Sequence, residues 1–147
     1  MSDYDPNYIP QKTYARLGQK AIVIDEQKKL LVLQRSEKSG SGGKWSLPGG
    51  AIDFGEDPEE SIKREVEEEV QIEVNDCKVF TFRSYVHNDN DHIIMIGWVC
   101  RTTSNNVVLN WEHDSYKWLT KEDALNLDLT EDGRFFIEHF ENDKLRH

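Results

Sequence analysis

The sequence predicts a single α/β domain, in which a mixed β-sheet carries helices on both faces. Apolar runs of strand length alternate with helical patterns in the order β, β, α, several β, α. The chain of 147 residues is long enough for one domain with a substantial buried core. Its composition, 37% hydrophobic and 10% aromatic, is that of a folded protein.

The first part of the chain predicts an arm followed by strands. Residues 1–16 are polar and include Pro6 and Pro10, which indicates an extended or partly disordered arm; the single domain is predicted over residues 17–147. From Gln19 the runs QKAIVID and LLVLQRS, joined by EQKK, predict a hairpin. After a Gly- and Ser-rich loop, KWSLPGG predicts a short strand ending at Pro48 and a glycine turn.

A helix is predicted to begin at Pro58. Asp57 is a favourable N-cap, proline is tolerated at the first helical position, and Glu60 completes an Asp-x-x-Glu capping box. An apolar residue recurs at every fourth position and predicts the buried side of the helix: Ile62, Val66 and Val70.

The same helix carries an unusual number of carboxylates. Glu65, Glu68 and Glu69 stand at i, i+3 and i+4, so their side chains converge on one face. The like-charge pair Glu65 and Glu69 costs a helix a few tenths of a kcal/mol, and Arg64 alone cannot neutralise the cluster. A hard divalent cation such as Mg2+, which prefers carboxylate oxygens, would compensate. The alternative is an ordinary solvated acidic face.

The residues flanking this cluster complete a longer motif. From Gly50 the chain reads glycine, five residues, Glu56, seven residues, and then REVEEEVQI from Arg64 to Ile72. This resembles the Nudix box, Gx5Ex7REUxEExGU with U an aliphatic residue, and the chain is identified as a MutT-like member of the Nudix hydrolase family. The departure is Gln71, where the family has a glycine at a helix C-cap that needs positive φ. The resemblance spans residues 19–140 and implies a Nudix-type α/β/α sandwich.

The resemblance also implies an activity. Mg2+, or alternatively Mn2+, would be held by Glu65, Glu68 and Glu69 together with a backbone carbonyl near Gly50. The ions would bridge a diphosphate and activate a water for in-line attack on phosphorus. The expected reaction is cleavage of a phosphoanhydride bond in a nucleoside triphosphate, or in another nucleoside diphosphate linked to a group X.

Further site residues follow with their alternatives. Arg64 is expected to orient a ligand carboxylate, with Glu56 as its partner, or to form an ordinary surface ion pair. Arg35 stands where related hydrolases place a phosphate-contacting arginine, or it is an ordinary edge charge. Three carboxylates are candidates for the general base, and the sequence does not rank them: Glu65, Glu68 and Glu112.

The rest of the chain is expected to complete the domain. EVNDCKVFTFRSYV, IIMIGWVCRTT and VVLNWEHDSYKWL predict strands, and Thr120 predicts the N-cap of a short helical turn.

Cys77 and Cys100 are expected to be buried free thiols. The terminal helix is expected to turn three aromatic rings inward: Phe135, Phe136 and Phe140. Core packing rather than base stacking is expected of Trp45, Tyr85, Trp98 and Trp118. Loop or strand-end positions, unsuited to metal binding, are expected of His87, His92 and His113.

Charge and family branch limit the partners. The net charge of −10 argues against binding to duplex nucleic acid or to an anionic membrane. The lack of a long apolar run and of a signal-peptide core predicts a cytoplasmic protein, and a homodimer remains open. No proline follows Pro58, which argues against the ADP-ribose branch and leaves the general MutT-like group. The alternative function is a nucleotide- or sugar-nucleotide-binding module without turnover; the presence of all three motif glutamates favours the enzyme.

Overall fold

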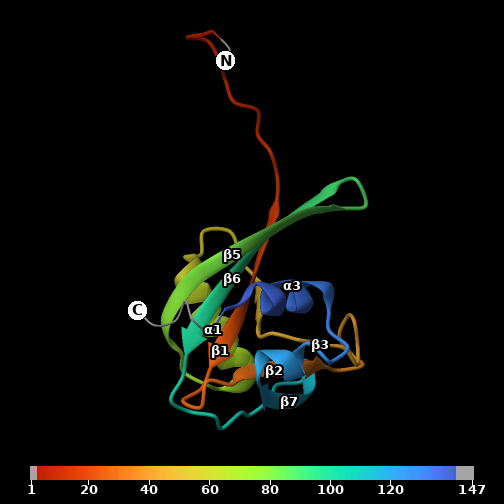
Figure 1. Cartoon of the computed structure of the whole chain (residues 1–147). Coiled ribbons are helices and arrows are strands. Elements are labelled where there is room, and N and C mark those ends of the chain that lie inside the picture. Colours follow the sequence, from red (N-terminus) through yellow and green to blue (C-terminus); the bar gives the residue numbers. More distant parts are fainter. Residues whose placement is uncertain (1–2, 142–147) are drawn as a thin grey trace.

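The computed structural model describes residues 3–141 and is built around a mixed seven-stranded sheet (Figure 1). The main strand order is β3-β2-β1-β6-β5, with β4 paired to β1 and β7 paired to β2. The strands are β1 Arg16–Ile24, β2 Leu30–Arg35, β3 Trp45–Ser46, β4 Gly49–Ala51, β5 Asn75–His87, β6 Asp91–Arg101 and β7 His113–Leu119. The helices are α1 Pro58–Val70, α2 Lys121–Ala124 and α3 Glu131–His139. Residues 142–147 of the predicted domain lie outside the described part.

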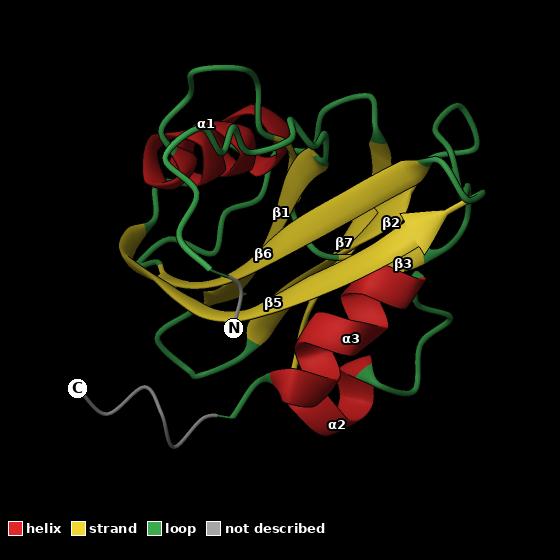
Figure 2. Cartoon of the chain, turned by 90° about the horizontal axis from the view of Figure 1, so that it is seen from above, coloured by secondary structure: helices red, strands yellow, loops and turns green. Residues whose placement is uncertain are grey.

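Helices cover both faces of the sheet, which confirms the predicted α/β/α architecture. Helix α1 lies on one face, and α2 and α3 lie on the other (Figure 2). Strand β1 serves both layers: Val23 packs with Ile62 and Val66 of α1, whereas Ile22 packs with Phe136 of α3. Because alternate residues of a strand point to opposite faces, the apolar run of β1 fills both cores. Strands β1 and β6 pair in parallel, and the other described strand pairs are antiparallel.

Helix α1 begins and ends as its sequence predicts. The Asp57 carboxylate accepts a hydrogen bond from the Glu60 backbone N–H at 3.0 Å, and the helix starts at Pro58. The apolar stripe is completely buried: Ile62, Val66 and Val70. At the C-terminal end Gln71 is left-handed, with φ 54° and ψ 41°, and its N–H donates to the Glu67 carbonyl. Gln71 therefore occupies the positive-φ cap that a glycine would fill without strain.

The predicted first hairpin is correct only near its turn. Strand β1 begins at Arg16, three residues before Gln19, because its parallel pairing with β6 already starts there. Strands β1 and β2 pair at Ile24 and Leu30 and then diverge. Beyond that point β1 pairs with β4 and β6, whereas β2 pairs with β3 and β7.

The predicted glycine turn is instead the strand β4. Gly49 has φ 149°, and a Cβ added there would lie 2.0 Å from the Gln19 carbonyl oxygen of β1. A glycine is needed at this position because the two backbones approach so closely. Gly49 and Gly50 therefore do not end a strand; they hold β4 against β1, opposite Lys20 and Gln19.

The segment expected to form a strand from Val107 is a strand only from His113. Its first part instead closes the end of α1: the N–H of Val108 donates to the Val70 carbonyl, and that of Asn110 to the Glu69 carbonyl. These are two of the carbonyls that a helix leaves unpaired at its C-terminus. The loop therefore brings Glu112 close to α1.

Most expectations for the remaining core are confirmed. Cys77 and Cys100 are buried free thiols, and Thr120 caps α2. Phe136 and Phe140 are buried, whereas Phe135 is only partly covered. Trp45 and Trp98 are buried, and Tyr85 and Trp118 pack against the core from partly exposed positions.

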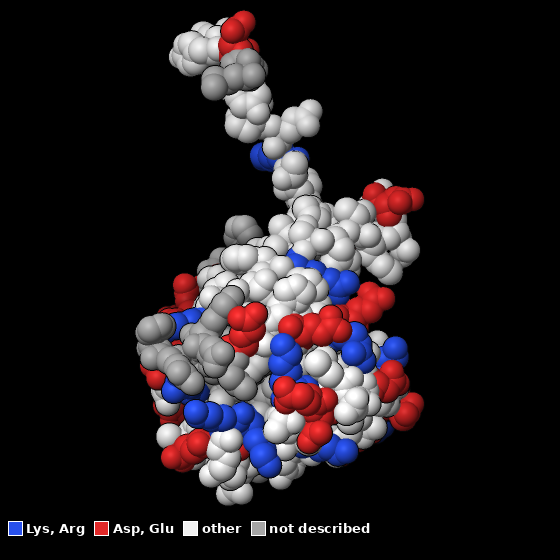
Figure 3. All heavy atoms as spheres, viewed as in Figure 1, with Lys and Arg blue, Asp and Glu red and all other residues white. Residues whose placement is uncertain are grey.

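Residues 3–15 contain no helix or strand, are exposed, and extend away from the sheet beside the projecting β5–β6 hairpin (Figure 1). No helix within residues 3–141 is long and apolar enough to cross a membrane. On the face seen in Figure 3 the acidic and basic side chains are interspersed, so the described residues form no continuous basic patch there.

Candidate active site

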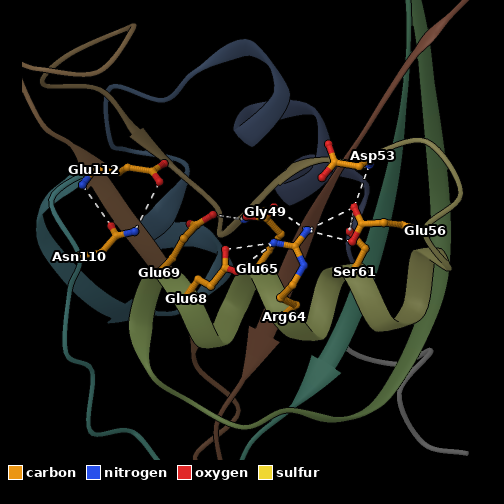
Figure 4. Close-up of polar contacts among 10 residues, drawn as sticks. All are labelled: Gly49, Asp53, Glu56, Ser61, Arg64, Glu65, Glu68, Glu69, Asn110 and Glu112. Carbon is orange, nitrogen blue, oxygen red and sulfur yellow. Dashed lines mark hydrogen bonds and ion pairs between the residues drawn. The ribbon is translucent and has the colours of Figure 1, made fainter.

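Two of the predicted metal-binding glutamates face strand β4 (Figure 4). The Glu69 carboxylate is buried, 2% exposed, and accepts a hydrogen bond from the Gly49 backbone N–H at 3.3 Å. Next to it, a Cβ added to Gly50 would lie 2.9 Å from the Glu65 carboxylate carbon. A glycine at position 50 thus lets β4 lie directly against the Glu65 carboxylate without displacing it.

Burial makes these two carboxylates difficult to ionise in the metal-free protein. Burial raises the pKa of Glu69 to about 8; Lys20 opposes this rise, whereas the charges of Glu65 and Glu112 add to it. Burial also raises the pKa of Glu65, and the neighbouring Arg64 opposes that shift. A cation bound between them would favour the ionised forms, so the site suits a divalent metal ion.

Arg64 ties the start of the motif to the acidic helix. Its Nη2 donates to both carboxylate oxygens of Glu56, at 3.0 and 3.2 Å, and its Nη1 donates to both oxygens of Glu68, at 3.0 and 3.1 Å. The backbone N–H of Asp53, and then Arg64, lower the pKa of Glu56. The structure thus pairs Arg64 with Glu56, the partner expected from the sequence.

Glu68 differs from the other two motif glutamates. Its side chain is 54% exposed and turned toward Arg64 rather than toward β4. Within residues 3–141, no three acidic, histidine or cysteine side chains are close enough together to hold a metal ion as they stand. The donor types nevertheless match those of a Mg2+ site, and Glu68 is close enough for its charge to raise the pKa of Glu65.

The two candidates outside the motif also lie near the cluster. Asn110 holds Glu112: it accepts a hydrogen bond from the Glu112 backbone N–H at 3.1 Å and donates to the Glu112 carboxylate at 3.4 Å. Glu112 is close enough for its charge to raise the pKa of Glu65 and Glu69. Arg35, at the end of β2, donates from Nε to the Gly40 carbonyl at 2.5 Å.

The comparisons with known proteins agree with this geometry. The model of the NUDIX domain family matches residues 15–140. The chain belongs to the NUDIX domain family. It is a Nudix hydrolase. One relative is nucleoside triphosphatase NudI of Enterobacter sp., which is 31% identical over 115 residues. The matched region covers 71% of this chain and 82% of that protein. An 8-oxo-dGTP diphosphatase of Proteus vulgaris is 38% identical over 56 residues, covering 38% of this chain and 50% of that protein.

Solved structures show the same fold. The MutT protein of Methanosarcina mazei Go1 superimposes with a TM-score of 0.74 at 27% identity, covering 93% of this chain and all of that one. The NUDIX domain of Shewanella oneidensis NrtR, solved with ADP ribose, has a TM-score of 0.72 at 21% identity, covering 93% of this chain and 91% of that one. At that identity the second likeness shows the fold alone.

Sequence reasoning missed two residues of this Nudix hydrolase near Glu69: His113, which lies beside it, and Lys20, whose charge acts on it. His113 is buried, and its Nε2 lies 3.9 Å from a Glu69 oxygen; burial lowers the pKa of His113 to about 4, so the ring is neutral at pH 7. No spacing motif marks it. Lys20 could have been suspected, because it shares its side of β1 with Ile22 and Ile24, where an apolar residue is expected.

A pocket of about 380 Å³ opens near the N-terminus of α3. Arg83 of β5 contacts two other residues that line the pocket. Its Nη1 donates to the Asp132 carboxylate at 2.7 Å, and its guanidinium carbon lies 4.4 Å from the centre of the Tyr85 ring. The pocket is lined by Ser41, Lys44, Arg83, Tyr85, His87, Thr130, Glu131 and Asp132. This Nudix hydrolase therefore has a polar cavity in addition to the acidic cluster.

Proposed function

We propose that the protein is a metal-dependent pyrophosphohydrolase of nucleotides. Its expected substrate is a nucleoside triphosphate or another nucleoside diphosphate linked to a group X. The observation that carries this proposal is the packing of Gly49 and Gly50 against the buried Glu69 and the partly buried Glu65. This packing brings together carboxylates that burial makes hard to ionise. The activities for which the relatives NudI and 8-oxo-dGTP diphosphatase are named favour a nucleoside triphosphate.

The proposed metal ligands are four groups at the contact between β4 and α1: the Gly50 carbonyl and the carboxylates of Glu65, Glu68 and Glu69. They suit Mg2+, with Mn2+ as the alternative, because both ions take oxygen ligands. Bound there, the metal would neutralise the charge of the diphosphate and lower the pKa of a water. The fit is supported by the burial of Glu69: within residues 3–141 no lysine or arginine forms an ion pair with it, and the neighbouring His113 is neutral.

The protein's own groups provide the proton transfer and the positioning. Glu65, Glu68 or Glu112 accepts the proton of the attacking water on a carboxylate oxygen. Arg64 keeps Glu56 in place and holds Glu68 until Glu68 turns to the metal, and it can do so without touching the substrate. Arg35 binds phosphate oxygens through the guanidinium nitrogens that its contact with Gly40 leaves available.

A release assay tests the proposal. The protein is incubated with nucleoside triphosphates, nucleotide sugars, ADP-ribose and dinucleoside polyphosphates, with either Mg2+ or EDTA, and phosphate is measured after coupled pyrophosphatase and phosphatase. Turnover of one class that depends on Mg2+ is the expected result. If the whole panel is inert while a nucleotide still raises the melting temperature, the protein is a binding module and the proposal is wrong.

A further inference from the structure

Lys20 is a cation placed among apolar side chains in the middle of the sheet. It lies on β1, between Gly49 of β4 and Gly97 of β6, and is partly buried. Its side chain is on the face of Ile22, the face covered by α3. A lysine in this position loses hydration and must recover it from protein groups or from a ligand.

The protein satisfies only part of this requirement. The Lys20 ammonium donates one described hydrogen bond, to the Leu47 carbonyl at 3.2 Å, although it carries three N–H donors. Within residues 3–141 no carboxylate forms an ion pair with it, and the Glu69 carboxylate accepts from the Gly49 N–H. Lys20 thus has donors to spare and lacks an anion in direct contact.

The charges around Lys20 come from both layers of the fold. Glu69 and Glu65 of α1 act on it from the acidic cluster, and Asp132 acts on it from α3, where it also lines the pocket with Arg83. Arg35 of β2 adds a second positive charge. The backbone geometry agrees: Lys20 pairs with Gly49, whose N–H holds Glu69, and its ammonium donates to Leu47, next to Ser46, which is hydrogen-bonded to Thr130 of the pocket. A ligand that extended from the acidic cluster toward the pocket would therefore bring its anionic groups to Lys20.

We propose that Lys20 is a substrate-binding residue whose ammonium holds the phosphate group on the pocket side of the diphosphate bound at the acidic cluster. This assignment rests on the proposed function, which supplies the diphosphate. A phosphate oxygen accepts the spare N–H donors, and its charge provides the counter-ion that the fold omits. The alternative role is a structural counter-charge that acts on Glu69 without a direct ion pair, and the experiments below separate the two roles.

The test compares Lys20→Met and Lys20→Arg with the control Lys29→Met. Lys29 is exposed in the turn between β1 and β2, so its substitution removes the same charge far from the site. Binding of inorganic pyrophosphate is measured by calorimetry at saturating Mg2+, after circular dichroism has shown that each variant is folded. Lys20→Met is expected to weaken binding roughly tenfold to a hundredfold, and Lys20→Arg to restore most of it. Lys29→Met should stay within about twofold of the unmodified protein.

A second readout separates binding from a structural role. Mn2+ affinity without pyrophosphate is measured by electron paramagnetic resonance on the same variants. A counter-charge for Glu69 would alter Mn2+ affinity and leave the pyrophosphate Kd at saturating metal unchanged, and this result would overturn the proposal. Equal pyrophosphate binding by Lys20→Met and Lys29→Met, or no binding by the unmodified protein, would also overturn it. Lys20-dependent binding together with an inert substrate panel would instead refute the proposed turnover and leave the Lys20 assignment standing.

Discussion

The carboxylate of Glu69, in the last turn of α1, accepts a hydrogen bond from the backbone N–H of Gly49 at 3.3 Å. This contact joins the acidic helix to a strand twenty residues earlier in the chain and buries the glutamate almost completely. Burial of a carboxylate favours its neutral form. The ionised form of Glu69 is therefore destabilised in the metal-free protein, and a bound cation would stabilise it. The packing of Glu69 against Gly49 thus favours the binding of a metal ion.

The first prediction concerns the pH dependence of stability in EDTA. Because burial raises the pKa of Glu69 from 4.5 to about 8, the folded protein binds more protons than the unfolded chain between these values. The Glu69 contribution to the free energy of unfolding should therefore fall as pH rises from about 4.5 to about 8, whereas buried His113, whose pKa is lowered from 6.5 to about 4, acts in the opposite direction between those two values. Glu69→Gln should remove this part of the slope, by on the order of a few kcal/mol across the window. Urea titrations of both proteins at several pH values measure the difference; parallel curves would contradict the assigned shift.

The second prediction concerns turnover. Glu68→Gln should lower kcat by at least about a hundredfold if Glu68 leaves Arg64 to bind metal or to accept the proton. Its effect on stability should stay under about 1 kcal/mol, because Glu68 is largely exposed and its contact with Arg64 is a surface ion pair. Glu67→Gln is the matched control, since Glu67 is exposed on the same helix and lies outside the motif's metal set. If both variants hydrolyse substrate at the normal rate, Glu68 has no place in the site.

The third prediction tests the contact between β4 and α1. Gly50→Ala places a Cβ 2.9 Å from the Glu65 carboxylate carbon, so either the side chain or the strand must move. A shift of this size in a metal ligand should lower kcat/KM by roughly tenfold to a hundredfold. Gly40→Ala serves as the control because nothing lies within 4 Å of its added Cβ. Steady-state kinetics give kcat/KM of the two variants. Equal kcat/KM values would show that the site tolerates displacement of Glu65.

Sequence could predict the parts of the site that are local. The cap at Asp57, the stripe of Ile62, Val66 and Val70, and the left-handed Gln71 all depend on neighbours within one helix. The strand formed by Gly49 and Gly50 could not be predicted, because it depends on β1, about thirty residues earlier. The approach of His113 and Lys20 to Glu69 likewise arises from the sheet, where β7 pairs with β2 and β1 pairs with β4. Contacts between segments so far apart in the chain produce no spacing motif that the sequence could reveal.

The final prediction concerns Gln71, which adopts φ 54° at the end of α1. A non-glycine residue in this region carries strain that glycine avoids, whereas the cap hydrogen bond from its N–H to the Glu67 carbonyl is available to either residue. Gln71→Gly should therefore raise the free energy of unfolding by about 0.5–1 kcal/mol and leave kcat/KM nearly unchanged. Thermal unfolding and steady-state kinetics measure the two effects. A large gain in activity without a gain in stability would mean that Gln71 distorts the acidic face, and Glu68, three residues before it, would then be the ligand to examine.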